Sequence, residues 1–382
     1  MKKTSLIVMA VAASFIAQGA DSPTVAHARA AGVELSSVRP RWPLAREASG
    51  QWGVVGEIVA TLDPGQTANV TSIGVSLFSA AGQWLASQRY DTPEMLSGML
   101  RVTTAGDDAV GWLPSGTTTF THGQRAVAFI AELSASRPAV AVVTLSLAGK
   151  SRAHIAVPLV DDATRPRFTW PMDVGGRPWI ASGTPGTPAH SQGGTLVIGG
   201  RLFNSQRFAF DLRQIDADIQ THPTGATHKE DYYAWGQAVR AMARGRVIAT
   251  VAGDPDFEIG DDIPPTQAPA GNYVVVQHGR SRFSVYAHLQ QGSVTVTPGA
   301  WVERGQALAF VGNSGHSSEP HLHVHVTDQW RGGADPLASF FVSQGVPIAL
   351  WGGAIFRDGE WLAVSGATPM ENDIIVPGDG GI

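Results

Sequence analysis

The stretch His321-Leu322-His323-Val324-His325 decides how the second half of this chain folds. In an extended strand successive side chains point to opposite faces, so the three imidazoles share one face and the apolar side chains share the other. A face of imidazoles is poorly suited to a hydrophobic core and well suited to binding a metal ion. The stretch therefore predicts a β-strand that packs on one side and carries a metal site on the other.

A hairpin is predicted just upstream, with strands at 272–278 and 282–288 joined by a turn at Gly279-Arg280-Ser281. By alternation along its second strand, Tyr286 and His288 fall on one polar face. His288 is therefore a further candidate for the site.

The absence of cysteine limits the ligands of such a site to histidine and carboxylate side chains. A catalytic zinc ion needs about three protein ligands and one open position. The helical signature His-Glu-x-x-His is absent, so the ligands are expected on strands.

The first 28 residues are typical of a secretory signal peptide, because Lys2 and Lys3 precede a short apolar run at 6–17 and small residues follow. Cleavage is expected after Ala28, with Ala20 as the alternative, and a retained anchor is the competing interpretation. The protein is thus expected to be exported, to the periplasm or the medium, without a transmembrane segment after removal of the signal. A formal net charge of −5 without any run of Lys or Arg argues against a nucleic-acid partner.

Residues 32–160 are predicted to form an antiparallel β-sandwich, immunoglobulin-like in general plan. Short β-like runs are separated by Gly, Pro, Asp and Ser, and helical periodicity is scarce. The clearest runs are 52–62, 71–78, 117–121, 126–133 and 139–147.

Three parts follow this sandwich. Residues 161–189 are rich in Pro and Gly and are expected to be a linker. Strand signals punctuated by glycine resume at 190–345, which is predicted to be an antiparallel β catalytic domain. The tail at 346–382 is expected to pack on this domain. The predicted fold class is therefore all-β.

From Gly236 to Val326 the sequence resembles the catalytic core of the lysostaphin/LytM-type zinc endopeptidases, peptidase family M23. The resemblance implies a fold of the M23 or hybrid-barrel type and a Zn²⁺ cofactor. It rests on six pieces in matching order: Gly236-Gln237-Ala238-Val239, Gly245-Arg246-Val247, the strand 271–278, Tyr286-Ala287-His288-Leu289, Val302-Glu303-Arg304-Gly305-Gln306, and Gly312-Asn313-Ser314-Gly315 leading to Pro320-His321-Leu322-His323.

The resemblance also implies roles for the histidines. The second histidine of His-x-His, here His323, would be a zinc ligand. His321 and His288 would flank the attacking water as general base and as stabiliser of the tetrahedral intermediate, which suits imidazole because it titrates near neutral pH. His325 lies where relatives often carry Glu or Gln, and we expect a surface group or a neighbour of a ligand there.

The other two ligands should come from a His-x-x-x-Asp element, and here the sequence departs from the family. Asp211 matches the aspartate, but Arg207 stands at the histidine position, and a guanidinium cannot bind a cation. In one interpretation His190 supplies the missing ligand; in the other the site has lost a ligand and is inactive. The intact remainder of the site favours the first. His222 and His228 are competing ligand candidates in an apparent insertion.

Asn313 and Ser314 lie in the loop that leads to the histidine strand. Together with Tyr286 they are candidates for substrate binding, and ordinary turn formation is the alternative for the loop residues.

These observations predict an exported zinc metalloendopeptidase. The resemblance implies peptide bonds of cell-wall peptidoglycan as its substrate, bound in an extended conformation. One alternative is a catalytically degenerate domain of the same fold that binds cell wall or regulates another hydrolase. Another is a group-carrying hybrid barrel of the sugar-phosphotransfer or lipoyl type, which the export signal and the metal-type residues disfavour.

Overall fold

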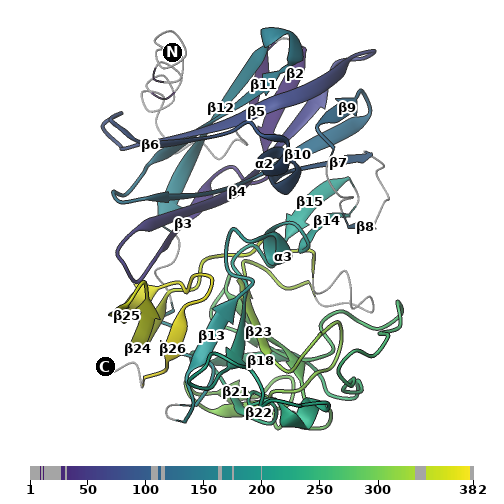
Figure 1. The fold of residues 1–382 in the computed structure, drawn as a ribbon, viewed down its shortest axis with the longest axis vertical. Coiled ribbons are helices and arrows are strands. Elements are labelled where there is room, and N and C mark those ends of the chain that lie inside the picture. Colours follow the sequence, from purple (N-terminus) through teal and green to yellow (C-terminus); the bar gives the residue numbers. More distant parts are fainter. Residues whose placement is uncertain are drawn as a thin grey trace. The chain divides into compact units, whose positions relative to one another are not determined.

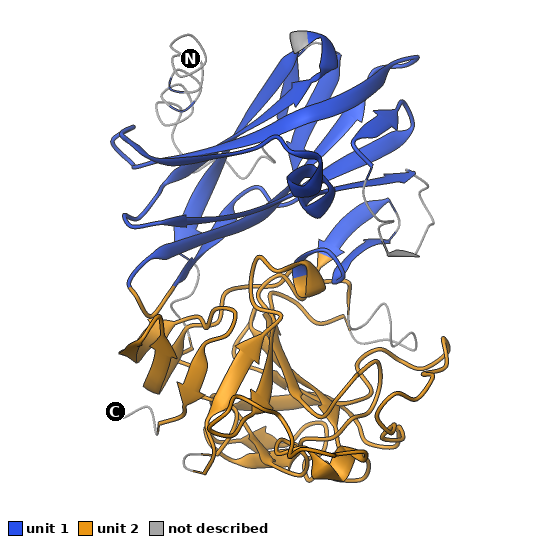
Figure 2. Ribbon diagram, in the orientation of Figure 1, with its two compact units in different colours: residues 1–46, 50–162, 191–203 blue, residues 47–49, 163–190, 204–382 orange. Residues whose placement is uncertain are grey.

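The chain folds into two compact units, coloured separately in Figure 2. The computed structural model describes Met9, Ala12 and residues 27–30, 32–104, 111–112, 117–161, 166–173, 176–198, 200–331 and 341–378. Unit 1 comprises residues 1–46, 50–162 and 191–203, and unit 2 comprises 47–49, 163–190 and 204–382. Nearly all regular structure is β-strand, so the predicted all-β class is confirmed. Within the described ranges, no helix has the length and apolar character needed to cross a membrane.

Unit 1 is built on an eleven-stranded sheet, counted over the described residues (Figure 1). Most of its buried apolar side chains form one large cluster. The central order is β1-β2-β4-β3-β12-β11-β5-β6; β10 pairs with β4 and β7, and β9 pairs with β5. The strands are β1 (His27–Ala30), β2 (Val33–Ser37), β3 (Trp42–Arg46), β4 (Trp52–Leu62), β5 (Thr67–Phe78), β6 (Trp84–Tyr90), β7 (Leu100–Thr104), β9 (Thr119–Thr121), β10 (Gln124–Ser134), β11 (Val140–Leu147) and β12 (Arg152–Asp161).

The predicted strand runs of this unit are confirmed within a few residues, because alternation of apolar side chains decided them. In β11, for example, Ala141, Val143 and Leu145 all point into the core. Most pairs are antiparallel, and β12 pairs with β3 in parallel. The immunoglobulin-like strand plan stays a prediction. A short helix, α2 (Pro93–Met99), begins with the Thr92 side chain capping the Met95 N–H, and a 3₁₀ turn, η1 (Ala148–Lys150), precedes β12.

Strand β1 bears on the expected signal cleavage. It pairs with β2 from His27 onwards, so cleavage after Ala28 would divide β1. The alternative site after Ala20 lies outside the described residues and would leave β1 whole.

Residues 191–203, which we expected in the catalytic domain, cluster with unit 1. Here β14 (Thr195–Ile198) pairs with β15 (Arg201–Asn204) and with β8 (Gly111–Trp112), and Arg125 donates to the Gly200 carbonyl. The chain therefore passes from unit 2 to unit 1 directly after His190 and returns at Asn204.

Unit 2 is built on a ten-stranded sheet with the order β21-β18-β19-β20-β23-β16-β13-β26-β24-β25 over the described residues. Its strands are β13 (Trp179–Ser182), β16 (Phe210–Gln214), β18 (Gly245–Val251), β19 (Asn272–Gln277), β20 (Phe283–Leu289), β21 (Trp301–Val302), β23 (Leu322–Thr327), β24 (Leu350–Arg357), β25 (Glu360–Ala367) and β26 (Ile374–Val376). The described part of unit 2 also contains a separate pair, β17 (Ala238–Arg240) and β22 (Ala307–Phe310), and the short turn η2 (Lys229–Asp231). The short helix α3 (Pro188–Ser191) lies at the point where the chain leaves the unit.

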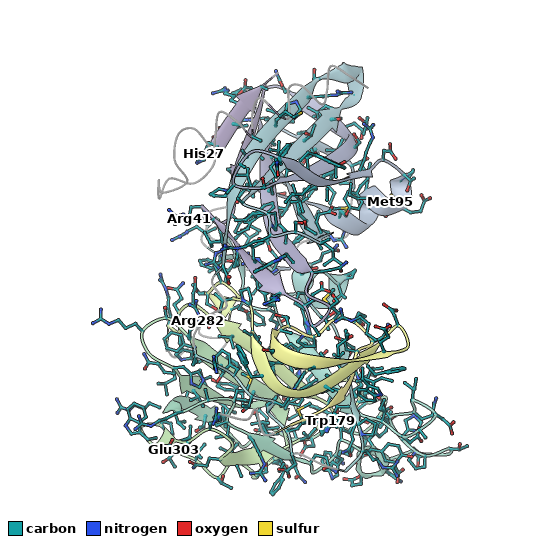
Figure 3. All side chains as sticks on the ribbon, turned by 90° about the vertical axis from the view of Figure 1, so that its left-hand side faces the viewer. His27, Arg41, Met95, Trp179, Arg282 and Glu303 are labelled. Atoms are coloured by element: carbon teal, nitrogen blue, oxygen red, sulfur yellow. The ribbon has the colours of Figure 1, made fainter. Side chains whose placement is uncertain are left out.

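The predicted histidine strand is confirmed as β23. Leu322, Val324 and Val326 are completely buried in the core of unit 2, which leaves the imidazoles on the opposite face. Trp179 of β13 lies among the side chains of the same core, whereas Met95 of α2 is exposed at the edge of unit 1 (Figure 3). Strands β16 and β20 flank β23, so their side chains line the imidazole face with it.

The segments on either side of the expected catalytic domain take part in its sheet. β13, which falls in the expected linker, pairs with β16 and with β26. β26 and β24, which both fall in the expected tail, pair with each other.

Candidate metal centre

Two neighbouring strands bring an aspartate and a histidine together. β16 pairs with β23 in a register that places Asp211 opposite His323. Phe210 and Leu212 on either side of the aspartate are buried in the core, so Asp211 points to the imidazole face. Its Oδ1 atom lies 3.0 Å from Nδ1 of His323.

His190 reaches the same carboxylate from α3. Its Nε2 atom lies 3.5 Å from Oδ1 of Asp211, and its ring centroid lies 4.8 Å from that of His323. Its Nδ1 atom donates a hydrogen bond to the Gly183 carbonyl. Since a carbonyl oxygen only accepts, the ring proton is on Nδ1, and the lone pair of Nε2 faces Asp211.

Gly183 allows this close approach. Its φ is +59°, and a Cβ atom there would lie 2.6 Å from Cε1 of His190. A side chain would therefore collide with the imidazole as well as strain the backbone. The next residue, Thr184, donates from its backbone N–H and its hydroxyl to Glu371, which holds the turn in place.

His190, Asp211 and His323 form a group suited to hold a metal ion. One nitrogen or carboxylate oxygen from each lies within 4.8 Å of the others. Two imidazoles and one carboxylate match the ligand sets of catalytic zinc sites, which leave a fourth position open. These residues therefore fit the zinc ion that the sequence predicted, and they are the three that it singled out as ligands.

Two more imidazoles lie beside this group. His321 donates from Nδ1 to the Glu319 carbonyl at 2.8 Å, and its Nε2 atom lies 3.6 Å from Oδ1 of Asp211. His288 donates from Nδ1 to the Ser314 carbonyl at 2.8 Å, and its ring centroid lies 4.7 Å from that of His321. In both rings the carbonyl fixes the proton on Nδ1, so Nε2 is the nitrogen that can take up another proton.

A bulge in β20 turns His288 into the site. Ala287 lies opposite His323, and Tyr286 lies opposite Val324 on the core face, so simple alternation would send His288 to the core. The pairing of β20 with β19 shifts register here, and His288 adopts a φ of +59°. Such a conformation is costly for a residue with a side chain, and strained backbone of this kind is typical of functional sites.

Burial controls the charge of these side chains. It lowers the pKa of His190 and His321, and it lowers the pKa of His288 well below 6.5, where nearby imidazoles add to the effect. Burial alone would raise the pKa of Asp211, but the surrounding imidazoles hold it well below 3.8. At neutral pH His190, His288 and His321 are therefore neutral and Asp211 is a carboxylate, which are protonation states that metal binding requires.

The metal-free protein should lose stability as pH falls from 7.5 to 5.5. Unfolded histidines take up protons near 6.5, while buried ones stay neutral to lower pH, so the unfolded chain binds more protons in this range. The loss is up to about 1.4 kcal/mol per pH unit for each such imidazole. Thermal unfolding in EDTA measures it, and a flat or rising stability would contradict it. His278→Phe, which removes a buried imidazole with a lowered pKa, should make the slope shallower.

The three residues expected to bind substrate are all buried. Tyr286 is in the core, where its hydroxyl accepts from the Met242 N–H at 2.8 Å. Asn313 donates to the Phe257 carbonyl, and Ser314 donates to the Leu289 carbonyl. Asn313 and Ser314 thus make the turn-forming contacts that were the alternative to substrate binding. The prediction that Tyr286 and His288 share a polar face is wrong, because Tyr286 lies in the core.

The competing ligand candidates His222 and His228 are not members of this group, and Arg207, which occupies the family's histidine position, has other partners. Arg207 is completely buried and donates to the Gln344 side chain at 2.8 Å. His222 is bonded to the Pro223 carbonyl, and His228 lies 3.7 Å from Glu258.

Sequence reasoning missed an ion pair at the edge of the site. Nε of Arg213 lies 2.6 Å from Oε1 of Glu319, whose carbonyl orients His321. Arg213 follows Asp211 by two residues on the same face of β16, and this spacing was the available signal.

A comparison with known protein families matches residues 230–335 to the family model of peptidase family M23. The peptidoglycan DD-endopeptidase ShyB of Vibrio cholerae is 33% identical over 129 residues, which cover 33% of this chain and 29% of that protein. ShyA, also a peptidoglycan DD-endopeptidase of V. cholerae, is 35% identical over 94 residues, covering 24% and 21%.

A third relative, the murein hydrolase activator EnvC of Escherichia coli, is 35% identical over 94 residues, covering 25% of this chain and 19% of that protein. The matched segments thus span less than a third of these relatives. The residues matched to the family model include His288, His321 and His323, whereas His190 and Asp211 precede them.

Proposed function

We propose that this chain, whose residues 230–335 match the family model of peptidase family M23, is an exported zinc metalloendopeptidase that hydrolyses peptide bonds in cell-wall peptidoglycan. The observation that carries the proposal is the group formed by His190, Asp211 and His323. The substrate class is supported by two relatives named as peptidoglycan DD-endopeptidases.

The contacts of the residues support the roles that the resemblance implies. A bound zinc ion would supply Lewis acidity, polarising the scissile carbonyl and lowering the pKa of water. His321 is the general base, because its Nε2 atom is free of a ring proton and faces Asp211 of the ligand group. We assign to His288 the stabilisation of the tetrahedral intermediate that the resemblance implies, a role that requires a proton on its Nε2 atom, and its Nδ1 bond to a backbone carbonyl holds the ring in place.

The purified full-length protein should bind about one zinc ion per chain, and His323→Ala should bind none tightly. The reason is that the variant loses one of only two imidazoles in the ligand group. Metal analysis after dialysis against trace zinc measures the stoichiometry. A wild-type protein that stays metal-free in ample zinc at neutral pH would refute the proposal.

Digestion of purified peptidoglycan tests the substrate. We expect the wild-type protein alone to release muropeptides with new peptide termini, which mass spectrometry identifies, and His323→Ala to release none. New sugar termini in place of peptide termini would contradict the assignment of a peptidase.

A regulator of another hydrolase is the second candidate function. It is favoured by the relative EnvC, a murein hydrolase activator that matches over as many residues as ShyA does. The ligand group and the two adjacent imidazoles favour the enzyme. A regulator would leave peptidoglycan intact on its own and would increase hydrolysis by a cell-wall hydrolase added to the same assay.

A further inference from the structure

His325 is the second histidine of β23, and of the two positions expected for it, at the surface or beside a ligand, the structure shows the one beside a ligand. Its side chain is completely buried. Its Nδ1 atom lies 2.9 Å from Nε2 of His323, and the two ring centroids are 5.1 Å apart. His325 therefore contacts a proposed zinc ligand directly without belonging to the ligand group.

The contacts of His323 determine which nitrogen donates in this pair. Nδ1 of His323 is the atom that faces Asp211, so it is the atom available to a metal ion. A neutral imidazole that presents a lone pair at Nδ1 carries its proton at Nε2. That proton points to Nδ1 of His325, which then has to accept it.

We propose that His325 is a positioning residue for the metal centre, accepting a hydrogen bond from Nε2–H of His323 and thereby fixing the tautomer and orientation of this ligand. The proposal rests on the proposed function, since it needs a metal ion at Nδ1. Metal-binding histidines commonly donate their second ring N–H to such an acceptor, and loss of the acceptor typically costs 10- to 100-fold in metal affinity.

The other imidazoles of the site are held differently. His190, His288 and His321 each donate to a backbone carbonyl, which no side-chain substitution removes. For His323 the contact at Nε2 is a side chain. Its orientation is therefore open to mutation without changing a ligand.

His325 is not placed to replace a ligand. Its Nδ1 atom faces Nε2 of His323, whereas Asp211 lies at Nδ1 of the same ring. The ring of His323 thus separates His325 from the carboxylate of Asp211. Nδ1 of His325 is directed at Nε2 of His323, which is not the nitrogen that faces the metal site.

Three full-length variants test the proposal by zinc affinity, measured by competition with a chromophoric chelator. His325→Phe keeps an aromatic ring but has no acceptor, and we expect zinc to bind about 10- to 100-fold more weakly. His325→Asn keeps an acceptor at the δ position and should recover most of the affinity. His278→Phe removes another buried imidazole, bonded to Arg244 and Ser284, and should leave zinc affinity unchanged.

Each result has one meaning. If wild type binds zinc and folded His325→Phe binds it equally well, the positioning role is refuted while the proposed function stands. If His325→Asn is as weak as His325→Phe, His325 acts only through packing, which also overturns the proposal. If wild type itself binds no zinc, the proposed function fails first.

A direct measurement covers the case in which His325→Phe does not fold. In zinc-loaded wild-type protein with ¹⁵N-labelled histidine, we expect NMR to show the His323 ring proton on Nε2, protected from exchange. A proton found on Nδ1, or rapid exchange at Nε2, would overturn the proposal.

Discussion

His190→Ala should abolish tight zinc binding and lower peptidoglycan hydrolysis by at least about 1,000-fold, since the loss of a Lewis acid costs several kcal/mol of transition-state stabilisation. The variant leaves Asp211 and His323 as the remaining members of the ligand group, one fewer than a catalytic zinc site needs. Zinc affinity by chelator competition and release of muropeptides are the two measurements.

His228→Ala is the matched control. It removes an exposed histidine of the same unit that lies near Glu258, so zinc binding and hydrolysis should stay at the wild-type level. Wild-type affinity in His190→Ala, with loss of affinity in His228→Ala, would show that the third ligand comes from the insertion after Asp211.

The sequence predicted most of the strands and part of the site, because the alternation of apolar and polar side chains indicates both where a strand lies and which of its side chains face the site. In β23 the period of two separates Leu322, Val324 and Val326 from the histidines, and the structure keeps this division. The same rule predicted the runs of unit 1 with small errors at their ends. Local pattern was sufficient wherever the strand was regular.

Alternation failed at the bulge in β20. It predicted one polar face for Tyr286 and His288, whereas the register shift leaves Tyr286 in the core and turns His288 into the site. A bulge depends on pairing with the neighbouring strand, here on the close passage of β19, and the periodicity of β20 alone does not contain that information. The buried Tyr286 hydroxyl is likewise explained by a partner, Met242, that is distant in sequence.

His190 was the least predictable member of the ligand group. Its sequence neighbourhood has no ligand spacing, and only the empty position at Arg207 pointed to it. Its orientation depends on Gly183, and the chain between His190 and Asp211 passes through unit 1. These are long-range features, so the resemblance could suggest His190 but not the fold that brings its Nε2 atom to 3.5 Å from Oδ1 of Asp211.

His321→Ala should lower hydrolysis by about 100- to 10,000-fold while zinc stays bound, because the variant loses a general base and keeps every member of the ligand group. The loss should fall on kcat more than on KM, since proton transfer occurs in the transition state. Steady-state kinetics on a soluble peptide released from peptidoglycan, with zinc analysis of the same sample, measure both.

The pH profile separates a proton-transfer role from a structural one. Burial lowers the pKa of His321 below 6.5, so this base stays unprotonated at neutral pH. Wild-type activity should therefore decline only at pH values below 6.5. In His321→Ala the residual activity should lack this acidic decline. If His288→Ala removes the decline and His321→Ala keeps it, the two roles are reversed. If His321→Ala loses zinc, the Nε2 atom that lies 3.6 Å from Asp211 is a ligand instead of a base.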